Sequence, residues 1–353
     1  MIDANILDKE AEIKKIDRSD MLGKVFALPE MLKEGARIAE SIKLDGVSDI
    51  SGVVVSGMGG SAICGDVVRG VLEEKIEIPI VVNRGYSLPR FVSGNTLFFA
   101  VSYSGNTEET LSILKQAEAR ALKIIALSSG GKLSEIAKQK GYPFISLPAG
   151  IPPRAALPYL LSSILIILEK LGIAPGASLE IEESLNLLKR LREEYMKERK
   201  ANPVKQLAQK LYGKIPVVFA SEGITSAAGL RWVTQFNENS KMIAHLSIFP
   251  EMGHNEIVGL ADLKRGKHDF SGVILRDEDD HERIKKRIEI TKSLIGGEFG
   301  KVAEVFSQGQ GKLARILSLI LYGDFLSVYL AVLRNIDPTP VKVIEKLKKE
   351  LSR

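Results

Sequence analysis

The sequence predicts an α/β fold made of two doubly wound parallel-sheet domains in tandem. Short β-branched runs alternate with amphipathic segments along most of the 353 residues, a pattern typical of a parallel sheet covered by helices on both faces. The order of strand, small-residue turn and helix occurs twice, beginning at 53–59 and again at 217–223. The chain length also suits two domains better than one.

The first half of the chain contains the clearer alternation. A helix is expected over 31–42, where apolar residues recur at helical spacing. The strands predicted after it are 50–56, 78–83, 96–102, 123–128 and 143–147, and the helices are 62–72, 108–121 and 133–140. A proline-rich connector, 148–158, leads into an apolar helix over 159–171.

The second half opens with a long charged segment, 179–200, which we expect to be a helix bridging the domains. The strands predicted after it are 216–221, 243–247, 272–276 and 302–306, and the helices are 226–238, 282–294 and 340–351. The apolar segment 313–333 contains Arg315, Gly323 and Asp324, which a membrane-spanning helix would tolerate poorly, so we expect a buried core helix.

These elements suggest a division into three parts. The first is an N-terminal helical segment (1–45) that packs on the core, the second is a first sheet domain (46–175), and the third is a second sheet domain with a C-terminal helix (176–353).

The composition is that of an ordinary globular chain, with 45% hydrophobic and 26% charged residues. The net charge of +5 is spread over segments of mixed sign, so nothing supports nucleic-acid binding. The single cysteine, Cys64, excludes an internal disulfide framework and fits a reducing compartment. Because residues 1–20 do not read as a secretory signal, we expect a cytoplasmic protein with no membrane partner.

Two strand ends carry glycine and hydroxyl residues immediately before a helix. Residues 57–62 read Gly-Met-Gly-Gly-Ser-Ala, and residues 102–107 read Ser-Tyr-Ser-Gly-Asn-Thr. Glycines let the backbone approach an anion, helix N-termini offer unpaired N–H groups, and strand ends of an open sheet line the crevice where ligands bind. The residues that we expect to bind a phosphate are Gly59, Gly60, Ser61, Ser102, Ser104 and Thr107.

Two other interpretations of these loops stay open. Thr107 could serve only as a helix N-cap. The glycine spacing of 57–62 also fits a dinucleotide fingerprint, and because the next strand ends at Asn83 rather than at an acidic residue, that would be an NADP site and not an NAD site. In an NADP oxidoreductase, no part of the ligand would be assigned to the 102–107 loop.

These loops, with later motifs, resemble a known family. Ser102-x-Ser104-Gly-x-Thr107 is similar to the phosphosugar signature of sugar-isomerase (SIS) domains, and 58–61 is similar to their first loop. The later motifs are Pro152-Pro153-Arg154, Phe236-Asn237-Glu238-Asn239, Gly253-His254-Asn255-Glu256 and Asp337-Pro338-Thr339-Pro340. In this order, over nearly the whole chain, they resemble the bifunctional phosphoglucose/phosphomannose isomerases of archaeal type, although the charged helix over 179–200 is longer than in compact members.

The resemblance implies SIS-type, flavodoxin-like domains and a homodimer with shared active sites. It also implies interconversion of glucose 6-phosphate and mannose 6-phosphate with fructose 6-phosphate through a cis-enediolate, without a metal or cofactor. In agreement, the sequence has no His-Glu-x-x-His motif and no cysteine cluster. A SIS-type sugar-phosphate sensor is the rival from another class, although 1–45 is a poor candidate for the DNA-binding domain that such sensors usually carry.

The resemblance also assigns roles to single residues. Glu238 would move a proton between C2 and C1, His254 would open the sugar ring, and Arg154 would stabilise the enediolate oxygens. Thr339 would leave free volume beside C2, so that both epimers react, and Lys346 would lie near the sugar ring.

Each of these residues has a plainer alternative. Glu238 could be a solvated helix end, Arg154 an inter-domain ion pair, and Lys346 part of a solvated helix face. Thr339 could cap the last helix, with Pro340 in its first turn. The other histidines, expected to be surface or hydrogen-bonded residues, are His245, His268 and His281.

Overall fold

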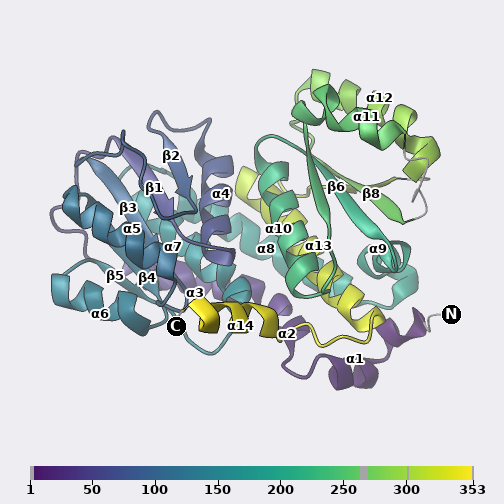
Figure 1. The fold of residues 1–353 in the computed structure, drawn as a ribbon, viewed down its shortest axis with the longest axis horizontal. Helices are drawn as coiled ribbons and strands as arrows, with labels where there is room; N and C mark the ends of the chain where they lie inside the picture. The colour runs from purple at the N-terminus through teal and green to yellow at the C-terminus, as the bar shows by residue number, and fades with distance from the viewer. Residues whose placement is uncertain (1–3, 263–268, 300–301, 352–353) are drawn as a thin grey trace. The chain divides into compact units, whose positions relative to one another are not determined.

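The computed structural model describes residues 4–262, 269–299 and 302–351 (Figure 1). Within them the strands form two sheets whose neighbouring strands are all parallel, which confirms the predicted fold class. By compactness the chain divides into a first-sheet unit, 27–189 with 308–318, and a second-sheet unit, 1–26 with 190–307 and 319–353. Our division at 45 and 175 follows the order of the sheets and stays a prediction.

The first-sheet unit is built on strands in the order β2-β1-β3-β4-β5. Its strands are β1 (Gly52–Ser56), β2 (Ile80–Asn83), β3 (Thr96–Val101), β4 (Lys123–Ser128) and β5 (Phe144–Ser146). The connection from β1 leads to β2 on one side of β1, and the chain then crosses to β3 on the other side of β1. The connections therefore diverge between β1 and β3. In open α/β sheets, that divergence point is the crevice where ligands bind.

Helices cover both faces of this sheet, as the alternation predicts (Figure 1). They are α3 (Leu28–Glu40), α4 (Gly60–Leu72), α5 (Glu108–Ala119), α6 (Gly131–Lys140) and α7 (Leu157–Lys170). Phe98 and Ile124 lie in one core cluster with apolar residues of α5 and α6. On the other face α4 packs closely, because a Cβ added at Gly65 would lie 2.9 Å from the Cβ of Val55. Neighbouring residues along a strand therefore pack against helices on opposite faces of the sheet.

The second-sheet unit has the strand order β7-β6-β8-β9. Its strands are β6 (Ile215–Ser221), β7 (His245–Phe249), β8 (Phe270–Arg276) and β9 (Ala303–Phe306), and its helices include α9 (Pro203–Leu211), α10 (Ile224–Glu238), α11 (Glu256–Ala261), α12 (Glu282–Phe299) and α14 (Lys342–Leu351). Phe219 and Ile274 pack with Ile288 of α12. On the opposite face, a Cβ added at Gly229 of α10 would lie 3.3 Å from the Cβ of Ala220.

Several predicted boundaries are wrong. The strand predicted over 243–247 is β7, two residues later, and Ile243 is exposed. The helix predicted from 340 begins at Lys342, since the carbonyl of Val341 is the acceptor for the N–H groups of Ile344 and Glu345. The charged helix α8 (Ala177–Met196) ends four residues early. The short elements that were not predicted include η1 (Ala4–Asp8), α1 (Glu10–Ile16), α2 (Met21–Phe26), α9 and α11.

Helix α13 (Lys312–Leu333) is the predicted core helix. Among the described residues it is the one helix long and apolar enough to cross a membrane, and the apolar window that qualifies it is entirely buried within the structure. This burial confirms the prediction for 313–333.

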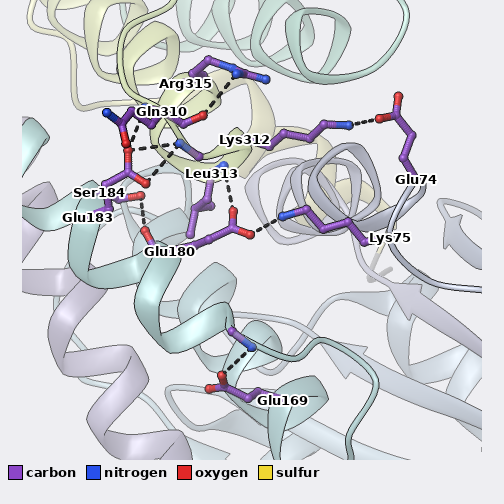
Figure 2. Close-up of polar contacts among 12 residues, drawn as sticks. Glu74, Lys75, Glu169, Glu180, Glu183, Ser184, Gln310, Lys312, Leu313 and Arg315 are labelled. Atoms are coloured by element: carbon purple, nitrogen blue, oxygen red, sulfur yellow. Dashed lines mark hydrogen bonds and ion pairs between the residues drawn. The ribbon is translucent and has the colours of Figure 1, made fainter. Parts of the chain in front are cut away.

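Carboxylates of α8 hold the start of α13, as Figure 2 shows. Glu183 accepts hydrogen bonds from the N–H groups of Gln310 (2.8 Å) and Gly311 (3.1 Å), and Glu180 accepts one from Leu313 (3.3 Å). Two ion pairs flank them, Lys75 with Glu180 and Lys312 with Glu74. The first N–H groups of a helix have no partner inside it, so these carboxylates supply acceptors at the start of α13 and offset the partial positive charge of that helix end.

Candidate active site

The first predicted loop joins β1 to α4 through glycines that the geometry requires. Gly59 sits at the N-cap of α4 with φ 53° and ψ −127°, a conformation that side chains with a Cβ rarely adopt. At Gly60, an added Cβ would lie 3.1 Å from both the Cα of Arg154 and the carbonyl oxygen of Pro153. The short 3-10 helix η2 (Pro153–Ala156) therefore lies directly against the N-terminal turn of α4.

The second loop joins β3 to α5 through a pair of hydroxyls. Ser102 is fully buried, and its Oγ lies 2.8 Å from Oγ1 of Thr107. Thr107 occupies the N-cap position of α5, but its side chain accepts no capping hydrogen bond from the residues that the structure describes. The N-cap interpretation thus accounts for its backbone position and not for its hydroxyl. Ser104 is exposed at the tip of the loop.

The two loops touch, as expected for neighbouring strand ends. The N–H of Tyr103 donates to Oγ of Ser61 (3.3 Å), and a Cβ at Gly57 would lie 2.9 Å from the carbonyl oxygen of Val101. All six residues predicted to bind phosphate follow β1 or β3, the strands between which the connections diverge. Arg154 is 3% exposed and belongs to the same unit.

A third loop, not singled out in the sequence, supports the second. It follows β4 with the sequence Ser-Ser-Gly-Gly at 128–131. Oγ of Ser129 donates to the carbonyl of Tyr103 (2.7 Å), and a Cβ at Gly105 would lie 1.7 Å from the carbonyl oxygen of Gly130. The run of serines and glycines at this third strand end is the sequence feature that could have predicted the loop's role.

Glu238 is the last residue of α10 and is half-buried. Its neighbour Asn239 is fully buried and donates from Nδ2 to Oγ of Ser327 on α13 (2.9 Å). The carbonyl of Glu238 accepts a hydrogen bond from Nζ of Lys241 (2.6 Å). The helix end is therefore anchored in the second-sheet unit and is not a freely solvated terminus.

Thr339 does not cap the last helix, because α14 begins three residues later. The N–H of Thr339 instead bonds Oδ1 of Asp337 (3.0 Å), and the preceding carbonyl, that of Pro338, accepts from Nζ of Lys241 (2.8 Å). One lysine thus bonds the carbonyl of Glu238 and the carbonyl of the residue before Thr339. The capping alternative for Thr339 is wrong.

His254 and Lys346 lie exposed on separate elements. His254 ends the 3-10 helix η4 (Glu251–His254), and Lys346 lies on α14. Of the other histidines, His245 pairs through Nε2 with Glu256 (2.8 Å), and His281 accepts at Nδ1 from the N–H of Arg283 (3.0 Å). His268 lies outside the described residues.

The described part of the chain holds no group of three His, Cys, Asp or Glu side chains that could bind a metal ion. Burial raises the pKa of the Tyr103 phenol beside the loops, so its hydroxyl stays protonated. That hydroxyl donates to the carbonyl of Pro148 (2.6 Å) and ties the second loop to the chain leading toward Arg154.

Two family models match the chain. The SIS domain matches residues 48–165, and the bacterial phospho-glucose isomerase C-terminal SIS domain matches residues 200–351. Both doubly wound sheets are therefore SIS domains.

Curated relatives match over most of their length. Bifunctional phosphoglucose/phosphomannose isomerases of Caldicellulosiruptor bescii and Aquifex aeolicus are 43% and 39% identical, over 94% and 86% of this chain and 99% and 91% of theirs. A D-glucosamine-6-phosphate 4-epimerase of Sulfolobus acidocaldarius is 31% identical over 90% of this chain and 95% of its own.

Solved structures share the fold at lower identity. The C-terminal domain of glucosamine-fructose-6-phosphate aminotransferase from Francisella tularensis superposes with a TM-score of 0.71 at 15% identity, covering 91% of this chain and 98% of that one. A glucose-6-phosphate isomerase like protein from Thermus thermophilus gives 0.61 at 17% identity, covering 97% and 98%. From the order of the motifs, the two SIS domains and the identity over nearly full length, we conclude that the chain belongs to the family of bifunctional phosphoglucose/phosphomannose isomerases.

Proposed function

We propose that this chain interconverts glucose 6-phosphate and mannose 6-phosphate with fructose 6-phosphate, by moving a proton between C2 and C1 through a cis-enediolate. The observation that carries the proposal is the pair of joined hydroxyl-and-glycine loops between β1 and β3, in a chain 43% identical to a relative named for both activities. We further propose that the reaction needs no metal or cofactor and takes place in cytoplasmic sugar-phosphate metabolism.

The phosphate would bind at the starts of α4 and α5. Helix N-termini present N–H groups and a partial positive charge. A Cβ built at Gly59 would have no atom within 4 Å, so an anion has room to approach the start of α4 there. The hydroxyls of Ser61, Ser104 and Thr107 add donors without adding charge. Holding the phosphate away from the reacting carbons lets remote binding energy orient C1 and C2.

The proton transfer would fall to Glu238. It would take the proton from C2 of the open-chain aldose and return it to C1, while Arg154 stabilises the charge that develops on the enediolate oxygens. The half-buried position of Glu238 at an anchored helix end supports a base held in one place. Lys346 would contact the sugar ring.

His254 would open the ring before proton transfer, and we propose that it serves the active site of a second copy in a homodimer. Its exposure in a single chain supports a role outside that chain. Mixing Glu238→Gln and His254→Asn subunits tests this directly. Shared sites predict recovery of about one quarter of wild-type activity, since half of the dimers are mixed and one site in each is intact. No recovery would contradict sharing.

A direct assay tests the reaction itself. The purified protein is incubated with glucose 6-phosphate, mannose 6-phosphate or glucosamine 6-phosphate, with and without a chelator, and the sugar products are identified. We expect fructose 6-phosphate from the first two in both conditions. Loss of activity in chelator would contradict the metal-free proposal, and a C4-epimerised product from glucosamine 6-phosphate alone would favour the chemistry named for the Sulfolobus acidocaldarius relative.

A further inference from the structure

Lys241 holds two segments that are far apart in sequence. Its Nζ donates to the carbonyl of Glu238 (2.6 Å) and to the carbonyl of Pro338, 97 residues away (2.8 Å). The last carbonyls of a helix have no partner inside it, and a lysine there also compensates the partial negative charge of the helix end. One ammonium therefore fixes the end of α10 against the Asp337–Thr339 turn.

The end of α10 has its own independent anchor on α13. Asp324 accepts from Nε and Nη2 of Arg231 (2.9 Å each) and from Nε2 of Gln235 (2.9 Å), and all three side chains are buried. One turn later Asn239 bonds Ser327. Glu238 thus stands on a fixed helix, and a change at Lys241 would act mainly on the turn that carries Thr339.

The backbone of Lys241 is also unusual. Its φ is 53°, in the left-handed region that residues other than glycine, asparagine and aspartate seldom occupy. That conformation turns the chain sharply after α10 and brings the lysine back over the helix end. The N–H of Met242 closes this turn on the carbonyl of Phe236 (3.0 Å), so the conformation ends α10 and lets the lysine side chain reach both carbonyls.

We propose that Lys241 is a specificity-determining positioning residue, which sets the separation between the base Glu238 and Thr339. This inference rests on the proposed function. The free volume beside C2 depends on where Thr339 lies relative to Glu238, and the intermediate must turn within that volume for the second epimer to react. A fixed separation therefore decides whether both epimers are substrates.

The test compares Lys241→Asn with two controls. Asparagine tolerates the left-handed conformation but cannot reach the carbonyls, whereas Lys241→Arg keeps the cation. Lys170→Asn is the matched control, because Lys170 bonds the carbonyls of Glu40 and Ile42 (2.6 Å each) at the end of α3 in the other unit. Steady-state kinetics with each aldose phosphate are measured for all variants, together with melting temperature.

Lys241→Asn is expected to lower kcat for mannose 6-phosphate about tenfold with little change in KM, and so to lower the mannose-to-glucose ratio of kcat/KM by at least about threefold. Lys241→Arg should keep the wild-type mannose-to-glucose ratio. Lys170→Asn should lower the melting temperature but leave that ratio unchanged. An unchanged ratio in Lys241→Asn would overturn the inference. If Glu238→Gln retained full turnover, the proposed function would fail instead, whatever Lys241 does.

Discussion

Oγ of Ser102 lies 2.8 Å from Oγ1 of Thr107, so the buried serine that follows β3 is hydrogen-bonded to the N-cap residue of α5. The N–H of Thr107 also approaches Oγ of Ser102 (3.4 Å). These contacts shape the second loop from within and leave the N–H groups of the first turn of α5 available to an anion.

Removing hydroxyls from this loop should weaken phosphate binding. For Ser104→Ala with Thr107→Ala we expect weaker binding of both sugar phosphates and of inorganic phosphate, by roughly 1–3 kcal/mol, the range for hydrogen bonds to a charged group. Competition by inorganic phosphate measures it. Ser226→Ala, which removes a hydroxyl bonded to the carbonyl of Gly223 at the start of α10, is the control and should change nothing. Unchanged phosphate competition in the double variant would place the phosphate elsewhere.

Enlarging Thr339 should separate the two activities. Thr339→Gln fills the space beside C2, so mannose 6-phosphate turnover should be lost while glucose 6-phosphate turnover is largely kept. Thr339→Ser and Thr339→Val, which keep the space, should retain both. Because α14 begins at Lys342, none of these variants removes a cap. Parallel loss of both activities in the glutamine variant would contradict the volume argument.

Glu183 should matter for stability and not for chemistry. Glu183→Ala removes the acceptor of the N–H groups of Gln310 and Gly311. Because Gln310 is exposed and Gly311 half-buried, water replaces part of the contact, and we expect the free energy of unfolding to fall by about 1 kcal/mol. Urea denaturation measures it, with Glu182→Ala on the exposed face of the same helix as control. Equal midpoints for the two variants would show that the start of α13 does not depend on this acceptor.

Cys64 should be unreactive in the folded protein. Burial, and then the charge of Asp66, raise the pKa of its thiol, so the thiolate stays scarce as the pH rises through 8. Alkylation of the native protein should remain slow from about pH 7 to 9, whereas the urea-unfolded chain should react faster with each step toward the ordinary thiol pKa of about 8.5. Equal native and unfolded rates would contradict the burial of this side chain.

Local signals explain what could be predicted from the sequence. The β-branched runs predicted each strand of the described residues to within a few positions. The two loops could be singled out because each is contiguous and its glycines and hydroxyls stand directly before a helix, and their binding of phosphate stays a prediction. Short helices such as α1 and α9 were missed because seven to nine residues make only about two turns, too few repeats for a helical period to stand out in the sequence.

Long-range contacts explain what could not be predicted. The start of α14 was misplaced because Pro340 suits the first turn of a helix, yet residues 337–339 are held by Asp337 and Lys241 in a turn of their own. The lysine bridge joins residues 97 positions apart, and no spacing rule connects them. The buried Arg231–Asp324 pair that anchors α10 is of the same kind.

Hydrogen exchange at C2 tests the central claim most directly. Glucose 6-phosphate is incubated in D2O with wild-type protein and with Glu238→Gln, and deuterium at C2 is followed by NMR. The wild type should exchange the C2 proton, and the variant should do so at least about a hundredfold more slowly, the scale of losing a general base. Phosphate competition should be unchanged in the variant. Exchange at the wild-type rate in Glu238→Gln would contradict the assignment of the base and with it the account of the site.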